Sequence, residues 1–216
     1  MGYLLYPCEA FGTWPDILRN VHVVLLAKPT GGYRPIALLP SIYRIWAKAR
    51  LSWVRIWASR LDRAYLALGA QKSTTDVAAR VLVQTEGGTI ASGTEHASMH
   101  AIVDIAKCFD KIPWDKLLKA AAVYGFPGQL IVLAFRIDSG ARRLVWDGCF
   151  SATTWARRGV LPGCAFAMFA LQCSMLAPFD AMLKHTDAIS RTIDLYADDI
   201  TLSIMAFVNR LLADSL

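Results

Sequence analysis

The sequence predicts a mixed α/β fold, and three observations support this prediction. Apolar runs rich in β-branched residues at 21–26 and 100–106 are typical of strands. Apolar residues recur at helical spacing from Ser41 to about Arg63, and again after Pro113-Trp114. Apolar positions alternate along 193–204, which predicts a β-hairpin. With 216 residues, the chain fits one domain, or one domain and a fragment.

Composition and charge narrow the class of protein. Hydrophobic residues make up 55% of the chain and charged residues 19%, so the sequence can bury a core and is not disordered. The net charge of +6 favours an acidic partner such as nucleic acid or anionic lipid, although an ordinary basic surface gives the same balance. Five scattered cysteines without a CxxC motif argue against a disulfide framework or a zinc ribbon. We therefore expect a reducing, intracellular environment.

The first half of the chain is predicted to begin with a strand pair and a helix. Thr30-Gly31-Gly32 forms a turn between the strand at 21–26 and an extended segment at 33–36. The helix from Ser41 would place one set of side chains in the core: Ile42, Ile45, Trp46, Trp53, Ile56, Trp57 and Leu61. Its other face is basic and is interpreted as solvated: Arg44, Lys48, Arg55, Arg60 and Arg63. A capping box at 73–76 opens a further helix, which Gly87-Gly88 is expected to close.

In the second half, 142–155 predicts a β-hairpin on an Asp147-Gly148 type I′ turn. The helix predicted at 163–183 is uncharged up to Asp180 and is long enough to cross a bilayer. Its prolines and polar residues instead favour a helix buried in the core, so we expect no membrane partner.

Three aspartates interrupt apolar strands. Asp104 lies inside the strand at 100–106, and Asp198-Asp199 lies at the tip of the hairpin at 193–204. Carboxylates are rarely buried in strands unless they are paired or bind a metal ion. If the three converge, their repulsion requires a divalent cation, and Mg²⁺ suits such oxygen ligands. The alternative is that Asp104 caps a turn and Asp198-Asp199 is a solvated loop.

Several motifs occur in a characteristic order. The two acidic motifs have their aspartates 94 residues apart: Ile102-Val103-Asp104-Ile105-Ala106-Lys107-Cys108-Phe109-Asp110 and Tyr196-Ala197-Asp198-Asp199. Three further motifs are Lys28-Pro29-Thr30-Gly31-Gly32-Tyr33-Arg34-Pro35-Ile36-Ala37-Leu38-Leu39, Ser73-Thr74-Thr75-Asp76 and Arg158-Gly159-Val160-Leu161-Pro162-Gly163-Cys164. Together they resemble the reverse transcriptases (RNA-directed DNA polymerases) of non-LTR retrotransposons and group II introns. The resemblance implies a right-hand fold with an antiparallel palm sheet, divided here into a fingers-like region at 1–95 and a palm-like region at 96–216.

The resemblance also implies roles for individual residues. Asp104, Asp198 and Asp199 would be catalytic acids that hold two Mg²⁺ ions, or Mn²⁺, with help from the Ile105 carbonyl. Lys28 and Arg34 would bind the triphosphate of an incoming dNTP. Phe109 would exclude the 2′-hydroxyl, and the backbone near Gly163 would line the nucleotide site. The implied partners are an RNA template and a DNA primer, with no obligate protein partner, and the implied location is the nucleus.

The sequence departs from the family pattern at two places. Pro162 replaces the usual glutamine, and Ala165-Phe166-Ala167 replaces a segment rich in proline and serine. The chain also continues for only 17 residues after Asp199, which predicts a fragment without a thumb or an endonuclease domain.

Two alternatives compete with an active reverse transcriptase. An RNA-dependent RNA polymerase shares the palm chemistry but is expected to carry Gly-Asp-Asp and a smaller residue in place of Phe109. A catalytically inactive, nucleic-acid-binding remnant of a decayed retroelement fits a missing thumb, whereas the intact acids argue against it. A P-loop at 68–73 is excluded because Gln71 replaces the glycine before the lysine.

Overall fold

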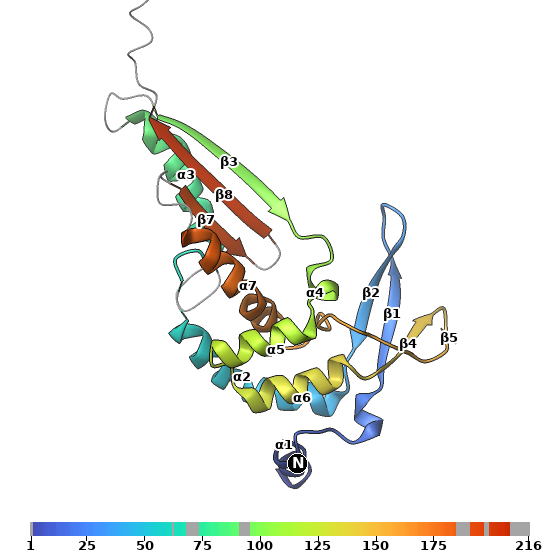
Figure 1. Cartoon of the computed structure of the whole chain (residues 1–216). Helices are drawn as coiled ribbons and strands as arrows, with labels where there is room; N and C mark the ends of the chain where they lie inside the picture. Colours follow the sequence, from blue (N-terminus) through green and yellow to red (C-terminus); the bar gives the residue numbers. More distant parts are fainter. Residues whose placement is uncertain are drawn as a thin grey trace, which may run out of the picture. The chain divides into compact units, whose positions relative to one another are not determined.

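The computed structural model describes residues 2–61, 63–67, 74–90, 96–184, 191–196 and 199–207. The chain divides into two compact units, each built from two stretches of sequence. Unit 1 comprises Met1–Trp57 and Lys107–Leu176, and unit 2 comprises Ala58–Ala106 and Ala177–Leu216. Each unit contains its own β-sheet and helices (Figure 1), which confirms the predicted mixed α/β class.

The sheet of unit 1 contains a hairpin and a parallel neighbour. Its strands are β1 (Val21–Ala27), β2 (Tyr33–Leu38), β4 (Ala141–Trp146), β5 (Cys149–Phe150) and β6 (Thr154–Trp155). β1 pairs antiparallel with β2 and parallel with β4, while β5 and β6 both pair with β4. Asp147 and Gly148 both have positive φ, at 46° and 74°, as the predicted type I′ turn requires.

Helices supply most of the core of unit 1. They are α1 (Gly2–Phe11), the short 3₁₀ helix η1 (Asp16–Arg19), α2 (Ser41–Arg60), α4 (Cys108–Lys111), α5 (Trp114–Val123), α6 (Gly128–Asp138) and the first part of α7 (Ala167–Lys184). An aromatic cluster lies at the centre: Trp14, Tyr43, Trp46 and Phe166. Edge-to-face ring pairs of this kind add to the stabilisation that burial of the rings provides.

The buried face of α2 differs from the predicted one. Trp46 and Trp57 are buried as expected, but Ile45, Trp53 and Ile56 are each about half exposed. The residues that fill the core beside the two tryptophans are Tyr43, Ala47, Val54 and Ala58. Both sets recur at helical spacing, but the buried face is shifted around the helix toward smaller residues, so several large apolar side chains of α2 stay exposed.

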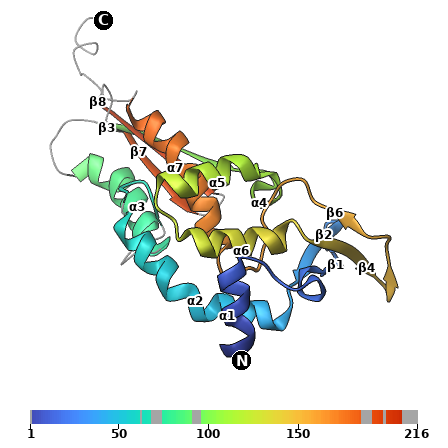
Figure 2. The same cartoon turned by 60° about the horizontal axis from the view of Figure 1, so that its bottom comes forward.

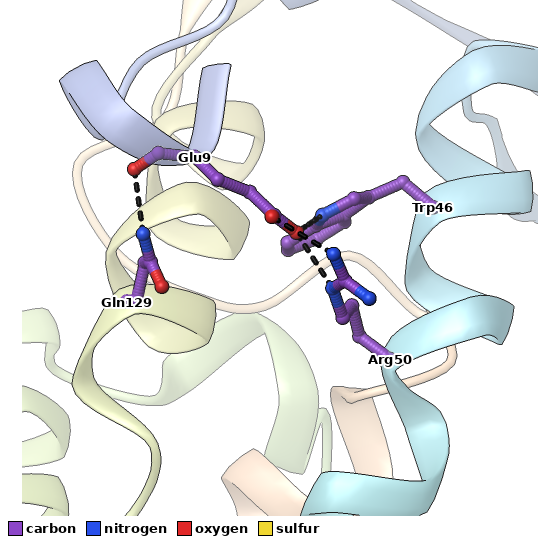
Figure 3. A network of polar contacts seen from close by, with 4 residues as sticks. All are labelled: Glu9, Trp46, Arg50 and Gln129. Carbon is purple, nitrogen blue, oxygen red and sulfur yellow. Dashed lines mark hydrogen bonds and ion pairs between the residues drawn. The ribbon is translucent and has the colours of Figure 1, made fainter. Parts of the chain in front are cut away.

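A polar network ties α1 to the other helices of unit 1 (Figure 3). The Glu9 carboxylate accepts hydrogen bonds from Trp46 Nε1 at 2.7 Å and from Arg50 Nε at 2.6 Å. The Glu9 carbonyl accepts one from Gln129 Nε2 of α6, also at 2.7 Å. Arg50 lowers the pKa of Glu9 and Glu9 raises that of Arg50, so each stabilises the charge of the other. Figure 2 shows α1 at one end of unit 1, beside α2 and α6.

Unit 2 is built on a three-stranded antiparallel sheet. Its strands lie side by side in the order β3 (His96–Asp104), β8 (Asp199–Phe207) and β7 (Arg191–Tyr196), as Figure 1 shows. The hairpin of β7 and β8 confirms the prediction for 193–204. At the outer edge of β7, the Leu195 amide donates to the Tyr65 carbonyl and the Ala67 amide donates to the Leu195 carbonyl. The helical part of unit 2 contains α3 (Thr74–Ile90), the end of α2 from Ala58, and the last residues of α7.

Two predicted helix boundaries are corrected. Helix α3 begins at Thr74, but it continues through Gly87-Gly88 to Ile90 instead of ending there. Glycine inside a helix costs only about 1 kcal/mol each, which does not force a helix to end. Helix α7 begins at Ala167 rather than Gly163, because Gly163 has a φ of +94°. Over the described residues, no helix has the length and hydropathy that a membrane span requires.

Candidate active site

Two of the predicted acids face each other across the sheet of unit 2. Asp104 is the last residue of β3 and Asp199 is the first residue of β8, and the antiparallel register pairs them directly. Side chains at directly paired positions project from the same face of a sheet, with Cβ atoms about 4.5–5.5 Å apart. The register therefore brings two carboxylates together at one end of this sheet. Asp198, which precedes Asp199, lies outside the described residues.

Both carboxylates are open to solvent. The strand pattern predicted a buried position for Asp104, and this was wrong, since Asp104 and Asp199 are both exposed. The reason is that β3 is an edge strand and that Asp104 is its last residue. Two like charges directly opposite each other repel, and water screens this repulsion only in part. An accessible pair of oxygen ligands of this kind suits a hard divalent cation such as Mg²⁺.

The same face of the sheet remains polar beyond the two aspartates. Asp199 is paired with Tyr196 on its other side, and Thr201 with Asp194. The Asp194 carboxylate is buried and forms an ion pair of 2.8 Å with Arg80 of α3. Sequence reasoning missed this pair, although an acid between Ile193 and Leu195 in an alternating strand was a usable signal.

The opposite face of this sheet is apolar. Val103, Ile200 and Leu202 line a small apolar hollow with residues from the end of α7: Pro178, Phe179 and Met182. Helix α7 therefore covers the apolar face, while α3 contacts the polar face through Arg80 and Asp194 and leaves the end with Asp104 and Asp199 exposed. The expected core role for the uncharged helix is consistent with this packing.

The predicted phosphate ligands are placed on the hairpin of β1 and β2 in unit 1. Arg34 pairs with Leu26 in the strand register, and Lys28 follows β1 directly. The turn is closed by two hydrogen bonds, from the Lys28 amide to the Gly32 carbonyl and from the Gly31 amide to the Lys28 carbonyl. Both glycines have positive φ. Lys28 and Arg34 are exposed, so their cationic groups are accessible to an anion.

Phe109 is held beside the segment 159–164, called here the Gly163 loop. The Val160 amide donates to the Phe109 carbonyl at 2.9 Å, and the Gly159 amide donates to the Ile112 carbonyl at 2.8 Å. A Cβ at Gly159 would lie 2.7 Å from the Asp110 carbonyl oxygen, so only glycine permits this close approach. Trp114 Nε1 adds a hydrogen bond of 2.6 Å to the Gly159 carbonyl.

The exposed part of the Gly163 loop is short and lies between two buried residues. Leu161 and Cys164 are 3% and 8% exposed, whereas Pro162 and Gly163 are exposed. Tyr43 Oη lies 2.9 Å from Cys164 Sγ, in hydrogen-bond contact. No heavy atom lies within 4 Å of the place where a Cβ of Gly163 would be. The backbone at Gly163 thus borders open space that another molecule can approach.

The structure therefore brings the predicted residues together in three groups. Asp104 and Asp199 are paired in unit 2, Phe109 lies against the Gly163 loop in unit 1, and Lys28 and Arg34 share a hairpin in unit 1. Ile105 follows Asp104 and is half-buried. Within the described part of the chain, no three histidine, cysteine or acidic side chains are close enough to hold a metal ion together.

The motifs and the fold agree with a known family. Residues 26–209 match the family model described as reverse transcriptase (RNA-dependent DNA polymerase). The chain belongs to the reverse transcriptase family. This family uses divalent metal ions and binds RNA templates. The sequence-based recognition of the family is thereby confirmed, while the narrower non-LTR or group II intron type stays a prediction.

Solved structures of other reverse transcriptases share the fold. A telomerase from Candida tropicalis, truncated from its C-terminal domain, is 14% identical to this chain and superposes with a TM-score of 0.60. The match covers 88% of this chain and 44% of that one. The telomerase from Candida albicans, in complex with the TWJ fragment of telomeric RNA, is 12% identical with a TM-score of 0.62, over 97% of this chain and 47% of that one. The chain thus spans less than half the length of these telomerases. No curated protein matches the sequence.

Proposed function

We propose that this reverse transcriptase domain adds dNTPs to a DNA primer on an RNA template, with Asp104, Asp198 and Asp199 as the catalytic acids. The observation that carries the proposal is the pairing of Asp104 with Asp199 at the open end of the polar sheet face. The family supports the reaction type, and the exposed carboxylates supply oxygen ligands suited to Mg²⁺.

In this proposal, Asp104, Asp198 and the Ile105 carbonyl would hold two Mg²⁺ ions, or Mn²⁺, and Asp199 would be the supporting acid. When bound, the ions stabilise negative charge on the attacking 3′-oxygen and on the leaving pyrophosphate. The ligands act by position and charge and form no covalent intermediate, as expected for phosphoryl transfer. The carboxylate repulsion across β3 and β8 favours cation binding, because the ions neutralise it.

The groups of unit 1 act on the incoming nucleotide. Lys28 would bind the triphosphate as a point charge and Arg34 would bind it with its two-pronged guanidinium. The open backbone at Gly163 would lie against the nucleotide. Phe109, fixed by its backbone contact with Val160, would stand under the sugar and exclude a 2′-hydroxyl. We further propose that 1–95 acts as the fingers and 96–216 as the palm, and that the protein works in the nucleus.

Primer extension on an RNA template tests the proposal. Because the chain spans less than half of the related telomerases, extension is measured with the chain alone and with the chain fused to the thumb of a related polymerase. We expect feeble extension by the chain alone and Mg²⁺-dependent dNTP incorporation by the fusion. Asp198→Asn should abolish incorporation, since it removes a charge from the ligand set and keeps the shape of the side chain.

Two outcomes would contradict the proposal. Extension that survives Asp198→Asn undiminished would exclude the acidic pair, and a folded fusion that never incorporates dNTPs would indicate a nucleic-acid-binding remnant. Phe109→Ala serves as the matched variant for specificity, because it leaves the acids untouched. It should admit ribonucleotides, and a variant that still rejects them would exclude Phe109 as the sugar gate.

A further inference from the structure

Asp138 is a buried acid for which the proposed chemistry has no use. It is the last residue of α6 and is only 5% exposed. The helix before it packs into the core through Leu130, Leu133 and Ile137, each at most 1% exposed. A carboxylate at such a position is costly unless it forms hydrogen bonds, so its partner indicates why it is there.

That partner is the Gly163 loop. Asp138 Oδ1 accepts a hydrogen bond of 2.9 Å from the Leu161 amide, across 23 residues of sequence and away from solvent. Arg142, the nearby cation, donates to the main-chain carbonyl of Asp138 and not to its carboxylate. The Asp138 side chain is therefore directed to the loop rather than to an ion pair.

The hydrogen bond from the Leu161 amide lies between two other attachments of the loop. Val160 is tied to Phe109 by its amide, and Cys164 is in contact with Tyr43. Between these two attachments, Pro162 has no amide hydrogen and Gly163 has a φ of +94° that few other residues adopt. The Leu161 amide is thus the last amide donor before the exposed Pro162-Gly163 backbone, and its hydrogen bond to Asp138 holds the chain at this point, beside the turn that the Cys164 amide closes on the Leu161 carbonyl.

The charged and titratable groups around Asp138 come from several elements. Burial raises the pKa of Asp138 to about 7, although the hydrogen bond from the Leu161 amide and the charge of Arg142 of β4 both lower it. Burial raises the pKa of Tyr43 of α2 and of Cys164 of the loop, and the nearby charge of Asp138 raises both further. Asp110 of α4 acts on Arg142. Asp138 accordingly changes its charge near neutral pH, and a carboxylate accepts a stronger hydrogen bond than a carboxylic acid does.

We propose that Asp138 is a positioning residue for nucleotide binding: it fixes the Leu161 amide and thereby the Pro162-Gly163 backbone against which the incoming dNTP lies. This inference rests on the proposed function, which assigns the nucleotide to Gly163. Asp138 touches neither the substrate nor the reacting atoms in this scheme. A substitution of Asp138 should therefore change the affinity for dNTPs. The size of the change depends on whether the new side chain offers a hydrogen-bond acceptor and a negative charge.

The test compares Asp138→Ala, which removes the acceptor, with Asp138→Asn, which keeps an acceptor but cannot ionise. The Kd for dTTP is measured with Mg²⁺ at pH 6 and pH 8, and exchange of the Leu161 amide is followed by NMR. Asp147→Asn is the matched control, because Asp147 is an exposed acid in a turn that asparagine tolerates. The Val160 amide, bonded to Phe109, is the internal reference for exchange.

We expect Asp138→Ala to raise the Kd about tenfold and to speed Leu161 exchange about tenfold relative to Val160. The ratio of the Asp138→Asn Kd to the wild-type Kd should be near one at pH 6 and rise several-fold at pH 8, because only the wild type gains a carboxylate. Taking the ratio cancels the titration of the nucleotide itself. A residue that only stabilised the fold would change the exchange of both amides and give no such pH-dependent ratio.

Failure of the positioning role and failure of the proposed function give different results. If wild-type protein binds dTTP, and Asp138→Ala binds it equally well with unchanged Leu161 exchange, the positioning role is wrong and the proposed function stands. If folded wild-type protein does not bind dTTP with Mg²⁺, the proposed function and this inference both fail. Should Asp138→Ala not fold, the pH-dependent ratio of Asp138→Asn decides, and a constant ratio overturns the inference.

Discussion

The acids of unit 2 and the buried acid of unit 1 have opposite surroundings. Asp104 and Asp199 are exposed, directly paired across two strands, and on the polar face of their sheet. Asp138 is single and buried, and it accepts a hydrogen bond from a backbone amide. A carboxylate that binds metal ions must be open to ligands and near a second acid, whereas a carboxylate that holds a loop must be shielded from water. The same residue type, aspartate, is thus assigned two roles that differ in exposure to solvent.

The largest expected effect is on catalysis, through the exposed pair. Asp104→Asn should lower dNTP incorporation on the order of 1000-fold or more, since it removes a ligand charge where the transition state develops negative charge. The same change should raise the free energy of unfolding by up to about 1 kcal/mol, because it relieves repulsion from Asp199. Primer extension and urea unfolding measure the two effects. A large loss of stability together with the loss of activity would indicate a structural role for Asp104.

The next largest effect is on stability, through the buried acid. The pKa of Asp138 is raised to about 7 in the folded chain, so folding disfavours its ionised form. Its contribution to stability is complete below about pH 4, the pKa range of the unfolded chain, and is lost progressively as the pH rises from there through the folded pKa of about 7. Relative to wild type, Asp138→Asn should gain about 3 kcal/mol in unfolding free energy between pH 5 and pH 8. A difference that does not change with pH would show that Asp138 ionises normally.

These two predictions rest on what the sequence could and could not reveal. That Asp104 and Asp199 come together was predictable because both interrupt apolar strand patterns, and the same alternation predicted the hairpin of β7 and β8. Asp138 was not, because it ends a helix, and its partner Leu161 is 23 residues away. The exposure of Asp104 was also missed. It depends on β3 being an edge strand of the sheet, and local sequence does not reveal the order of the strands.

A smaller effect is expected where the Gly163 loop passes Asp110. Gly159→Ala should cost about 2 kcal/mol, because a Cβ would lie 2.7 Å from the Asp110 carbonyl oxygen at a φ of +92°. Thermal unfolding measures this cost. Gly128→Ala is the control, since Gly128 is the first residue of α6 and has open space around its Cβ position. Equal stability of both variants would mean that the loop does not need this close approach.

The smallest effect is expected at Glu9, an acid of unit 1 that is paired with a cation. Its pKa is lowered by Arg50, so its stabilising effect is present at neutral pH and is lost as the pH falls through the folded pKa. Glu9→Gln should cost about 1–2 kcal/mol at pH 7 and almost nothing near pH 3. The exposed pair of Asp16 and Arg19 offers a control, because Asp16→Asn should cost less. A cost that persists unchanged at pH 3 would rule out the ion pair as its cause.

The central claim is that the paired, exposed acids form the metal site, and Fe²⁺-directed backbone cleavage tests it most directly. Fe²⁺ takes the place of Mg²⁺, and peroxide with ascorbate then generates radicals that cut the chain next to the bound ion. We expect cuts beside Asp104-Ile105 and beside Asp198-Asp199, suppressed by excess Mg²⁺ and lost in Asp104→Asn. Cleavage confined to other segments, or cuts at these sites that Asp104→Asn leaves unchanged, would contradict the assignment.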